Sequence, residues 1–251
     1  MRARALVFFA AALLPAPLLQ AQTEDVGAGQ RFRAVLNGAF APASLSFQES
    51  RRFTEFAETG TLDASYKDDA GPGLDLGLQY NFAGRVGVMA GLSKFSRSGG
   101  GSFTATLPHP LYFNQLRRAE GNFQGYDYLE TALHFDLVAS KAKGAIEFVV
   151  FAGATRFNVK TDVVDTLQYS HSYPYDSVTI TSVPKKRHSQ SPTGFNLGGR
   201  LDYGMGRAKR VGLGLQVRYS RASVQLAPAE GSNIKLDVGG LHVGLGARLF
   251  F

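Results

Sequence analysis

Apolar and polar residues alternate with a period of two along several segments of the chain. The clearest segment is residues 74–82, where leucine, tyrosine and phenylalanine fill the even positions and Asp75, Gly77, Gln79 and Asn81 fill the odd ones. Because successive side chains of a strand point to opposite faces, this pattern predicts a strand with one apolar face. The same pattern recurs at residues 30–40, 86–92, 129–137, 146–152, 195–203, 211–219 and 237–251.

The connections between these segments are alternately short and long. Short turns lie at residues 83–85, 141–144 and 204–210, whereas long polar stretches lie at residues 41–73, 94–125, 158–193 and 221–236. An even number of strands joined in this way is typical of a barrel that crosses a membrane with its long loops outside. We therefore predict an all-β fold, an eight-stranded antiparallel up-and-down transmembrane β-barrel.

Two alternatives to this fold remain open at this stage. Residues 162–169 and 177–183 also alternate, on either side of a turn at residues 173–176. If that hairpin joins the wall, the barrel has ten strands. A soluble β-sandwich would alternate as well, but it does not account for the asymmetry of the connections.

The first 21 residues have the layout of a secretory signal peptide. Arg2 and Arg4 precede an apolar run at residues 5–14, and two prolines and then Ala21 follow it. The apolar run is too short for a membrane-spanning helix. We predict that residues 1–21 are a cleavable signal peptide and that residues 22–251 form the barrel domain.

Charge and composition narrow the classes of function. Without residues 1–21, 25 of the 27 basic residues remain against 20 acidic ones. This modest excess suits contact with anionic lipid or a polyanion; an exported chain meets little nucleic acid, so no nucleic-acid partner is predicted. The sequence contains no cysteine, which excludes thiol catalysis and thiolate metal sites.

The segment at residues 237–251 carries the most specific motif of the chain, the ending Gly-Ala-Arg-Leu-Phe-Phe at residues 246–251. This ending resembles the C-terminal targeting strand of small bacterial outer-membrane barrels, the OmpA-like and opacity-protein-like class, and the resemblance extends from about Gly27 to Phe251. It implies residence in the cell outer membrane and insertion by the barrel assembly machinery, with Gly246, Leu249 and Phe251 as the assembly signal. A resemblance of fold carries no specific function.

The polar faces of the predicted strands would line the interior of the barrel. Five basic and five acidic residues fall on these faces: Arg31, Arg33, Asp75, Glu130, Asp136, Glu147, Arg200, Asp202, Arg218 and Arg248. An eight-stranded barrel has room for little besides side chains, and an unpaired buried charge costs about 3–5 kcal/mol. We therefore predict that these charges pair across a plugged lumen. The alternative is a gated polar path in which the pairs exchange partners and let small solutes through.

Depth along the strands separates these charges further. Asp136 is expected toward the periplasmic end of the lumen, whereas Asp75, Glu130 and Arg218 are expected nearer the outer mouth.

Few residues are candidates for catalysis or metal binding. His134 and His242 lie on lumen faces, where we expect them in the hydrogen-bond network, because no third metal ligand stands out. His171 and Ser172 are neighbours on a predicted loop, as are His188 and Ser189, but neither pair singles out a nucleophile. No catalytic, cofactor-binding or metal-binding residue is predicted, and no cofactor is expected.

Two basic groups lie on predicted outer loops: the pair Arg117 and Arg118, and the run Lys185, Lys186 and Arg187. They are candidates for binding lipopolysaccharide phosphates or a host polyanion through charge-assisted hydrogen bonds, although such runs are commonly just solvated.

The resulting hypothesis is a non-enzymatic outer-membrane barrel, embedded in outer-membrane lipids, whose extracellular loops serve envelope integrity or bind an external ligand. A narrow porin-like channel for ions or small solutes is the alternative. A lipid-modifying barrel enzyme is a third.

Overall fold

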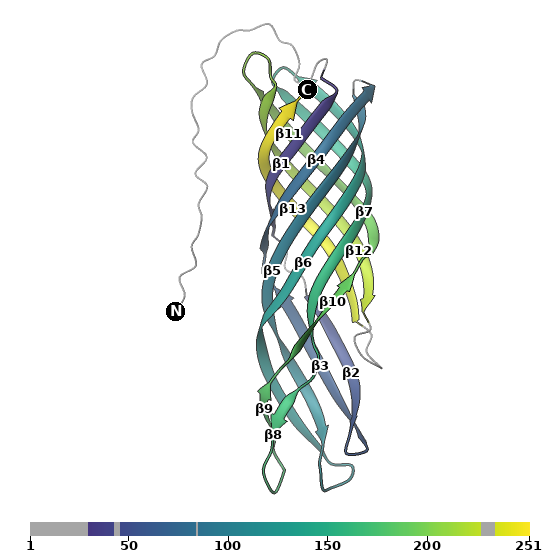
Figure 1. The fold of residues 1–251 in the computed structure, drawn as a ribbon, viewed down its shortest axis with the longest axis vertical. Helices are drawn as coiled ribbons and strands as arrows, with labels where there is room; N and C mark the ends of the chain where they lie inside the picture. The colour runs from purple at the N-terminus through teal and green to yellow at the C-terminus, as the bar shows by residue number, and fades with distance from the viewer. Residues whose placement is uncertain (1–29, 43–45, 84, 227–233) are drawn as a thin grey trace, which may run out of the picture.

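The computed structural model describes residues 30–42, 46–83, 85–226 and 234–251, and the predicted signal peptide lies outside these residues. Within the described ranges there is no helix long and apolar enough to cross a membrane. Eight strands make the wall (Figure 1): β1 (Phe32–Ala41), β4 (Gly71–Ala83), β5 (Val86–Pro108), β6 (Leu116–Lys143), β7 (Ile146–Val164), β11 (Thr193–Met205), β12 (Val211–Leu226) and β13 (Ile234–Phe250).

The wall closes on itself because its first and last strands pair. β1 and β13 are antiparallel, from the pair Arg33 and Phe250 to the pair Phe40 and Val243. At this seam Gly246 is needed for close approach: an added Cβ would meet the Leu36 carbonyl oxygen at 1.8 Å. Every other neighbouring pair in the ring is also antiparallel. The predicted eight-stranded barrel is confirmed.

The hairpin that raised the ten-strand alternative stays out of the wall. β8 (Gln168–Ser170) and β9 (Thr179–Ser182) pair only with each other, in a separate two-stranded sheet. Residues 162–164 end the wall strand β7, and the rest of this alternation belongs to a small hairpin that packs against the core of the extended part of the barrel. The count of ten strands is therefore wrong.

All four long connections contain strand structure; in the fourth, β12 and β13 continue and pair as far as Leu226 and Ile234. Residues 94–125, predicted as a loop, continue β5 and β6, which pair as far as Pro108 and Leu116. β2 (Ser46–Glu55) and β3 (Glu58–Asp68) form a hairpin, and β3 pairs with residues 99–106 of β5. β10 (Lys185–Gln190) pairs with the outer end of β7. The barrel is therefore extended at the end opposite the one where the chain terminates (Figure 1).

An apolar belt surrounds the half of the barrel nearest the C-terminus. Its outward-facing side chains are large and exposed, for example Leu78 (69%), Leu137 (68%) and Leu245 (59%). The belt covers residues 32–40, 74–82, 86–92, 129–139, 146–154, 195–203, 211–219 and 241–249. These segments are close to the roughly 9–11 residues that a strand needs to cross a bilayer. An apolar exterior on every wall strand is the arrangement of a transmembrane barrel.

Beyond the belt the polarity of the wall reverses, while the alternation of side chains continues in phase. On β7 the outward residues change from Ala152 and Ala154 to Arg156, Asn158 and Lys160. On the same strand the inward residues change from a lumen that holds Glu147 and Thr155 to Phe157, Val159 and Val163, all at most 2% exposed. Water replaces lipid as the outer environment at this level, so the apolar residues move inside.

The outer half of the barrel has a packed hydrophobic core. Phe47 stacks on Tyr66 with ring centroids 4.4 Å apart, and Tyr126 lies 5.5 Å from Tyr66. The phenol of Tyr126 is hydrogen-bonded to Thr161 Oγ1 at 2.7 Å. The inward residues of β13 beyond the belt, Ile234 among them, join this core. The half of the barrel beyond the belt therefore resembles the interior of a soluble protein rather than a set of loops.

Candidate functional site

The lumen inside the belt is filled by layers of paired charges, beginning at the end nearest the C-terminus. Arg33 forms a buried ion pair with Glu147, which lies on the opposite wall. The Arg33 guanidinium also lies over the ring of Phe250, 5.5 Å from its centroid. All three side chains are at most 3% exposed, so this end of the lumen is closed to solvent.

The second layer is centred on the carboxylate of Asp202. Arg200 Nε donates to Asp202 Oδ2 at 2.7 Å, and Arg248 Nε donates to Asp202 Oδ1 at 2.6 Å. Arg200 Nη2 donates to Gln79 Oε1 and Arg248 Nη1 donates to Asn37 Oδ1, both at 2.7 Å. One buried acid thus holds two buried arginines, and two side-chain amides complete the layer.

The third layer places Arg218 between two acids, with Asp75 at 3.7 Å and Asp136 at 3.8 Å. Asn196 Nδ2 donates to Asp136 Oδ1 at 2.7 Å, and Gln216 Nε2 donates to Asp75 Oδ2 at 2.5 Å. Asp136 therefore lies in the same layer as Asp75 and Arg218, not nearer the periplasmic end as its sequence position predicts. The free space here is only about 10 Å³, about what one water molecule needs.

The two lumen histidines adjoin the third layer. His134 is hydrogen-bonded to Ser93 Oγ and Thr155 Oγ1, both at 2.9 Å, as a member of a hydrogen-bond network. His242 stacks on Phe95 with centroids 4.0 Å apart, and neither of its ring nitrogens has a hydrogen-bond partner among the described residues. Glu130 accepts hydrogen bonds from the Tyr128 hydroxyl at 2.6 Å and from the backbone N–H of Gly239 at 3.1 Å.

Two buried charged residues just beyond the belt, Asp68 and Arg97, were missed from the sequence. Arg97 lies 3.9 Å from Asp68, and its guanidinium is 5.6 Å from the ring centroid of Tyr128. Burial raises the pKa of Asp68 to about 6, although the charge of Arg97 opposes this shift. Arg97 is in phase with Ser93 and Phe95 on β5, so extending the predicted strand past residue 92 would have found it.

Of the ten predicted lumen charges, nine are buried inside the barrel and Arg31 is not. Arg31 is exposed because it precedes Phe32, the residue at which β1 begins. Its assignment to the lumen is wrong.

The predicted basic groups are not a continuous accessible patch. Arg117 is only 4% exposed and donates to the Pro108 carbonyl at 2.7 Å and the Tyr175 carbonyl at 3.3 Å, so its assignment to a surface loop is wrong. It belongs to β6, where it faces inward. Arg118 is exposed and lies 3.4 Å from Glu120.

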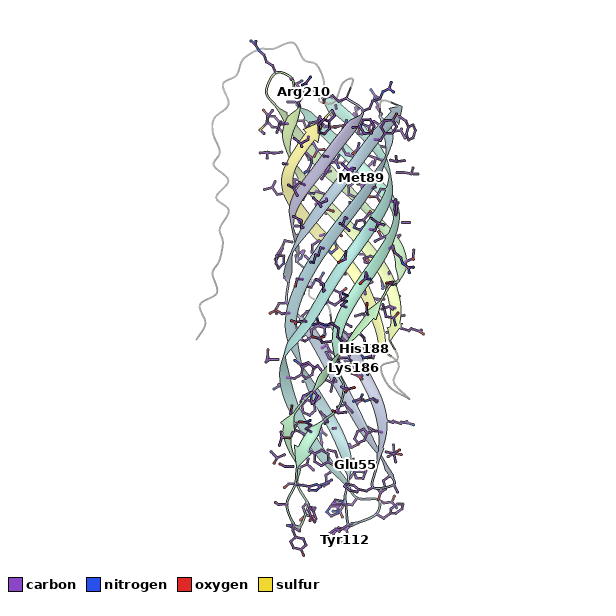
Figure 2. The ribbon with its side chains drawn as sticks, in the orientation of Figure 1. Glu55, Met89, Tyr112, Lys186, His188 and Arg210 are labelled. Atoms are coloured by element: carbon purple, nitrogen blue, oxygen red, sulfur yellow. The ribbon has the colours of Figure 1, made fainter. Side chains whose placement is uncertain are left out.

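The second basic group lies on β10 rather than on a loop. Arg187 forms a two-point contact with Asp162, at 2.8 and 3.1 Å. Lys185 Nζ donates to the carbonyls of Gln124 and Gly125 at 2.6 and 2.7 Å. Lys186 is exposed on the outer surface of the wall (Figure 2). Most of these cations therefore hold β10 in place.

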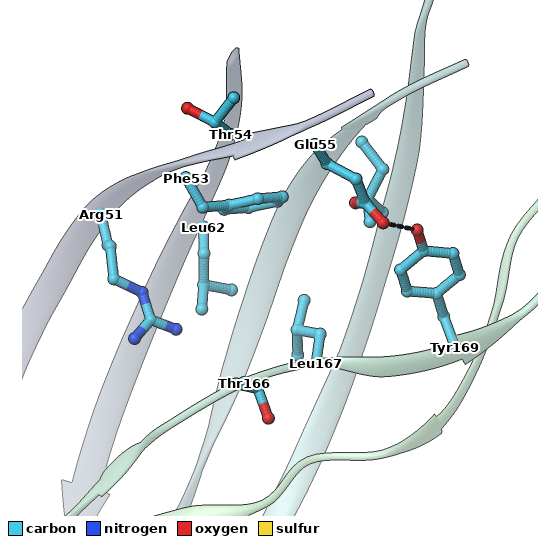
Figure 3. A pocket seen from close by; sticks show the side chains of 9 residues that line it. Arg51, Phe53, Thr54, Glu55, Leu62, Thr166, Leu167 and Tyr169 are labelled. Atoms are coloured by element: carbon cyan, nitrogen blue, oxygen red, sulfur yellow. Dashed lines mark hydrogen bonds between the residues drawn. The ribbon is translucent and has the colours of Figure 1, made fainter. Parts of the chain in front are cut away.

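A cavity of about 270 Å³ lies at the far end of the outer half, between the β2–β3 hairpin and the segment before β8 (Figure 3). Leu62, Leu107 and Leu167 supply its apolar walls, and Arg51 and Glu55 lie at its margins. The Tyr169 hydroxyl donates a hydrogen bond to Glu55. Burial and this contact raise the pKa of Tyr169 to about 12.

Exposed apolar side chains gather on the turns at this far end. Tyr112 marks the place in Figure 2, at the end opposite Arg210. The set comes from three turns and comprises Phe56, Leu111, Tyr112, Phe113, Leu116 and Tyr173. Phe113 and Tyr173 are 76% and 80% exposed, more than any large apolar residue of the belt. We call these six residues the apolar tip.

No protein-family model and no curated protein matches the chain, but solved structures do. OprG of Pseudomonas aeruginosa has a TM-score of 0.52 at 12% identity, over 88% of this chain and 96% of that one. The outer-membrane protease OmpT of Escherichia coli has a TM-score of 0.46 at 11% identity, over 92% and 99%. Neisserial surface protein A has a TM-score of 0.44 at 10% identity, over 88% and 97%. The structural neighbours are small outer-membrane barrels, the class that the sequence predicted, and the likeness is one of fold.

Proposed function

We propose that this protein is a non-conducting, non-enzymatic outer-membrane barrel that holds a folded extracellular half away from the membrane to bind an external ligand. The observation that carries the proposal is the packed hydrophobic core of the outer half, which lies above a lumen filled with paired charges. A channel needs a continuous water-filled path through the barrel. Side chains interrupt such a path in both halves of this barrel. Conductance in planar bilayers tests the proposal, and we expect none.

The apolar tip supports ligand binding over a purely mechanical role in envelope integrity. Its side chains lie beyond the packed core, where lipid does not cover them. Large apolar side chains exposed together at one end of a molecule are typical of surfaces that contact other molecules.

Removing the apolar tip should abolish most of the protein's retention on octyl-agarose. The change is Leu111→Ser, Phe113→Ser and Tyr173→Ser in protein reconstituted into lipid nanodiscs, with empty nanodiscs as the baseline. The reason is that these three side chains are 59–80% exposed. The matched control, Leu133→Ser in the belt, should keep full retention because lipid covers that residue. Equal retention of the tip variant and the unaltered protein would contradict a role for the tip.

Lipopolysaccharide is the proposed partner at the edge of the belt. Lys94, Arg156 and Lys160 are exposed on the outer wall directly beyond the apolar segments of β5 and β7. The ladder connects Lys94 through Thr131 to Asn158, and two strand spacings separate these rows by roughly 10 Å. Cations at this level would meet the phosphates of the outer leaflet through charge-assisted hydrogen bonds.

Replacing Lys94, Arg156 and Lys160 with glutamine should weaken binding of lipopolysaccharide that lacks O-antigen by about tenfold, since three phosphate contacts are lost. The loss should shrink as salt is raised, because exposed charges are screened. Binding to detergent-solubilised protein measures it. Glutamine at Lys141, Lys143 and Arg207, which are exposed near the opposite end, removes the same charge and should have no effect. Equal losses in the two triple variants would contradict the proposed site.

We also propose that the barrel assembly machinery inserts this protein by recognising the motif at residues 246–251. Leu249 and Phe251 are 43% and 66% exposed on the outer face of the wall, where a membrane-embedded assembly factor could contact them. Gly246 contributes through the close approach of β13 to β1 at the seam.

A further inference from the structure

Arg51 is a buried cation without a hydrogen-bond partner. Its side chain is 8% exposed, and it lines the cavity at the far end of the barrel. None of the hydrogen bonds or ion pairs of the described residues involves its guanidinium, and its Nε is buried without a partner. A guanidinium that is mostly buried and makes no hydrogen bond is costly, so a ligand that supplies an anion there would be favoured.

The nearest acid, Glu49, acts on Arg51 through its charge alone, and no hydrogen bond or ion pair joins the two among the described residues. Glu49 lies two residues away on the same face of β2, and its Oε2 accepts a hydrogen bond from the Tyr66 hydroxyl at 2.7 Å. Burial raises the pKa of Glu49, although the Tyr66 hydrogen bond and the charge of Arg51 oppose this rise. Glu55, the other acid of the cavity, is engaged by Tyr169.

The rest of the cavity is suited to an apolar group. Leu62 and Leu107 are each 1% exposed, and Leu167 approaches from the opposite side (Figure 3). The volume of about 270 Å³ lies just below the roughly 300–1,000 Å³ of common ligand pockets. The Arg51 guanidinium extends from β2 toward the side of the cavity where Thr166 and Leu167 lie (Figure 3).

We propose that this cavity binds a small amphipathic organic anion, of the size and chemistry of a medium-chain carboxylate. The carboxylate would take bidentate hydrogen bonds from Arg51, and the alkyl chain would lie between Leu62, Leu107 and Leu167. A planar guanidinium matches the geometry of a carboxylate, and burial of the methylene groups adds a favourable transfer free energy. This inference rests on the proposed function, because it takes the outer half to be the ligand-binding part.

Titration of the full chain in lipid nanodiscs with sodium octanoate tests the inference, followed by NMR of ¹³C-labelled leucine methyl groups. Saturable shifts confined to Leu62, Leu107 and Leu167 are expected. Arg51→Gln should raise the dissociation constant by about tenfold or more, since a charge-assisted pair is lost. Arg52→Gln is the matched control: Arg52 is the next residue of β2 and is exposed on the opposite face, so binding should be unchanged.

Leu167→Trp keeps Arg51 and fills the cavity, so it should abolish the shifts while leaving the remaining spectrum intact. If Arg51→Gln does not fold, Leu167→Trp still tests whether octanoate binds in this cavity. Shifts that never saturate, equal losses in the two arginine variants, or equally tight binding of octylamine would overturn the inference. None of these outcomes predicts the conductance of the protein or its retention on octyl-agarose. The proposed function is therefore tested independently of this inference.

Discussion

Replacing Asp202 with alanine should lower the free energy of unfolding by about 3–5 kcal/mol, because it leaves buried charges without their partner. Arg200 and Arg248 both donate to this carboxylate, at 2.7 and 2.6 Å, and all three side chains are at most 1% exposed. Urea unfolding of the protein inserted into lipid vesicles measures the change.

An exposed pair of similar geometry is the control for this result. Asp237 accepts from Arg221 at 2.8 Å on the outer surface beyond the belt. Asp237→Ala should leave unfolding unchanged, because exposed ion pairs are screened by solvent. If Asp202→Ala is as harmless as Asp237→Ala, the paired charges do not hold the lumen together.

Replacing Phe157 with alanine should lower the free energy of unfolding by about 3–5 kcal/mol, the usual cost of a large cavity in a packed core. Phe157 is fully buried in the outer half of the barrel, beyond the apolar belt. The residues around it lie in what the sequence predicts to be polar loops, and a mobile loop would tolerate the change. The same urea unfolding, read through intrinsic tyrosine fluorescence, measures it.

Phe113→Ala is the matched control, the same substitution at a residue that is 76% exposed on the apolar tip. It should leave the free energy of unfolding unaltered, because no cavity forms. A loss as small for Phe157→Ala as for Phe113→Ala would mean that the outer half is not a packed unit.

The sequence predicts the membrane-embedded part of the fold well, because one rule applies along its whole length. Lipid outside and polar side chains inside produce the alternation at residues 74–82 and 241–249, and both segments are wall strands. The same rule ends each predicted strand where its outer face becomes polar. Beyond residue 154 the outer face of β7 contacts water, so Phe157 and Val159 turn inward and the strand continues to Val164. The polarity pattern reverses at that residue, and for this reason the sequence predicts a loop where the structure has a strand.

The partners of the lumen charges could be predicted only in part. Arg200 and Asp202 lie two residues apart on one face of β11, so their contact follows from the sequence alone. The position of Arg218 between Asp75 and Asp136 depends on the shear of the barrel, which sets the relative heights of β4, β6 and β12. Sequence position alone placed Asp136 too close to the periplasmic end of the lumen. Sequence position also placed Arg31 inside β1, although β1 begins one residue later.

Conductance of the refolded protein in planar lipid bilayers tests the central claim most directly. Folding is established first from the heat-dependent shift in electrophoretic mobility. A sealed lumen, with about 10 Å³ of free space around Arg218, predicts no discrete current steps, and none when Glu130 or Arg218 is neutralised. Reproducible single-channel steps from the folded protein, altered by either substitution, would show a conducting lumen and contradict the account.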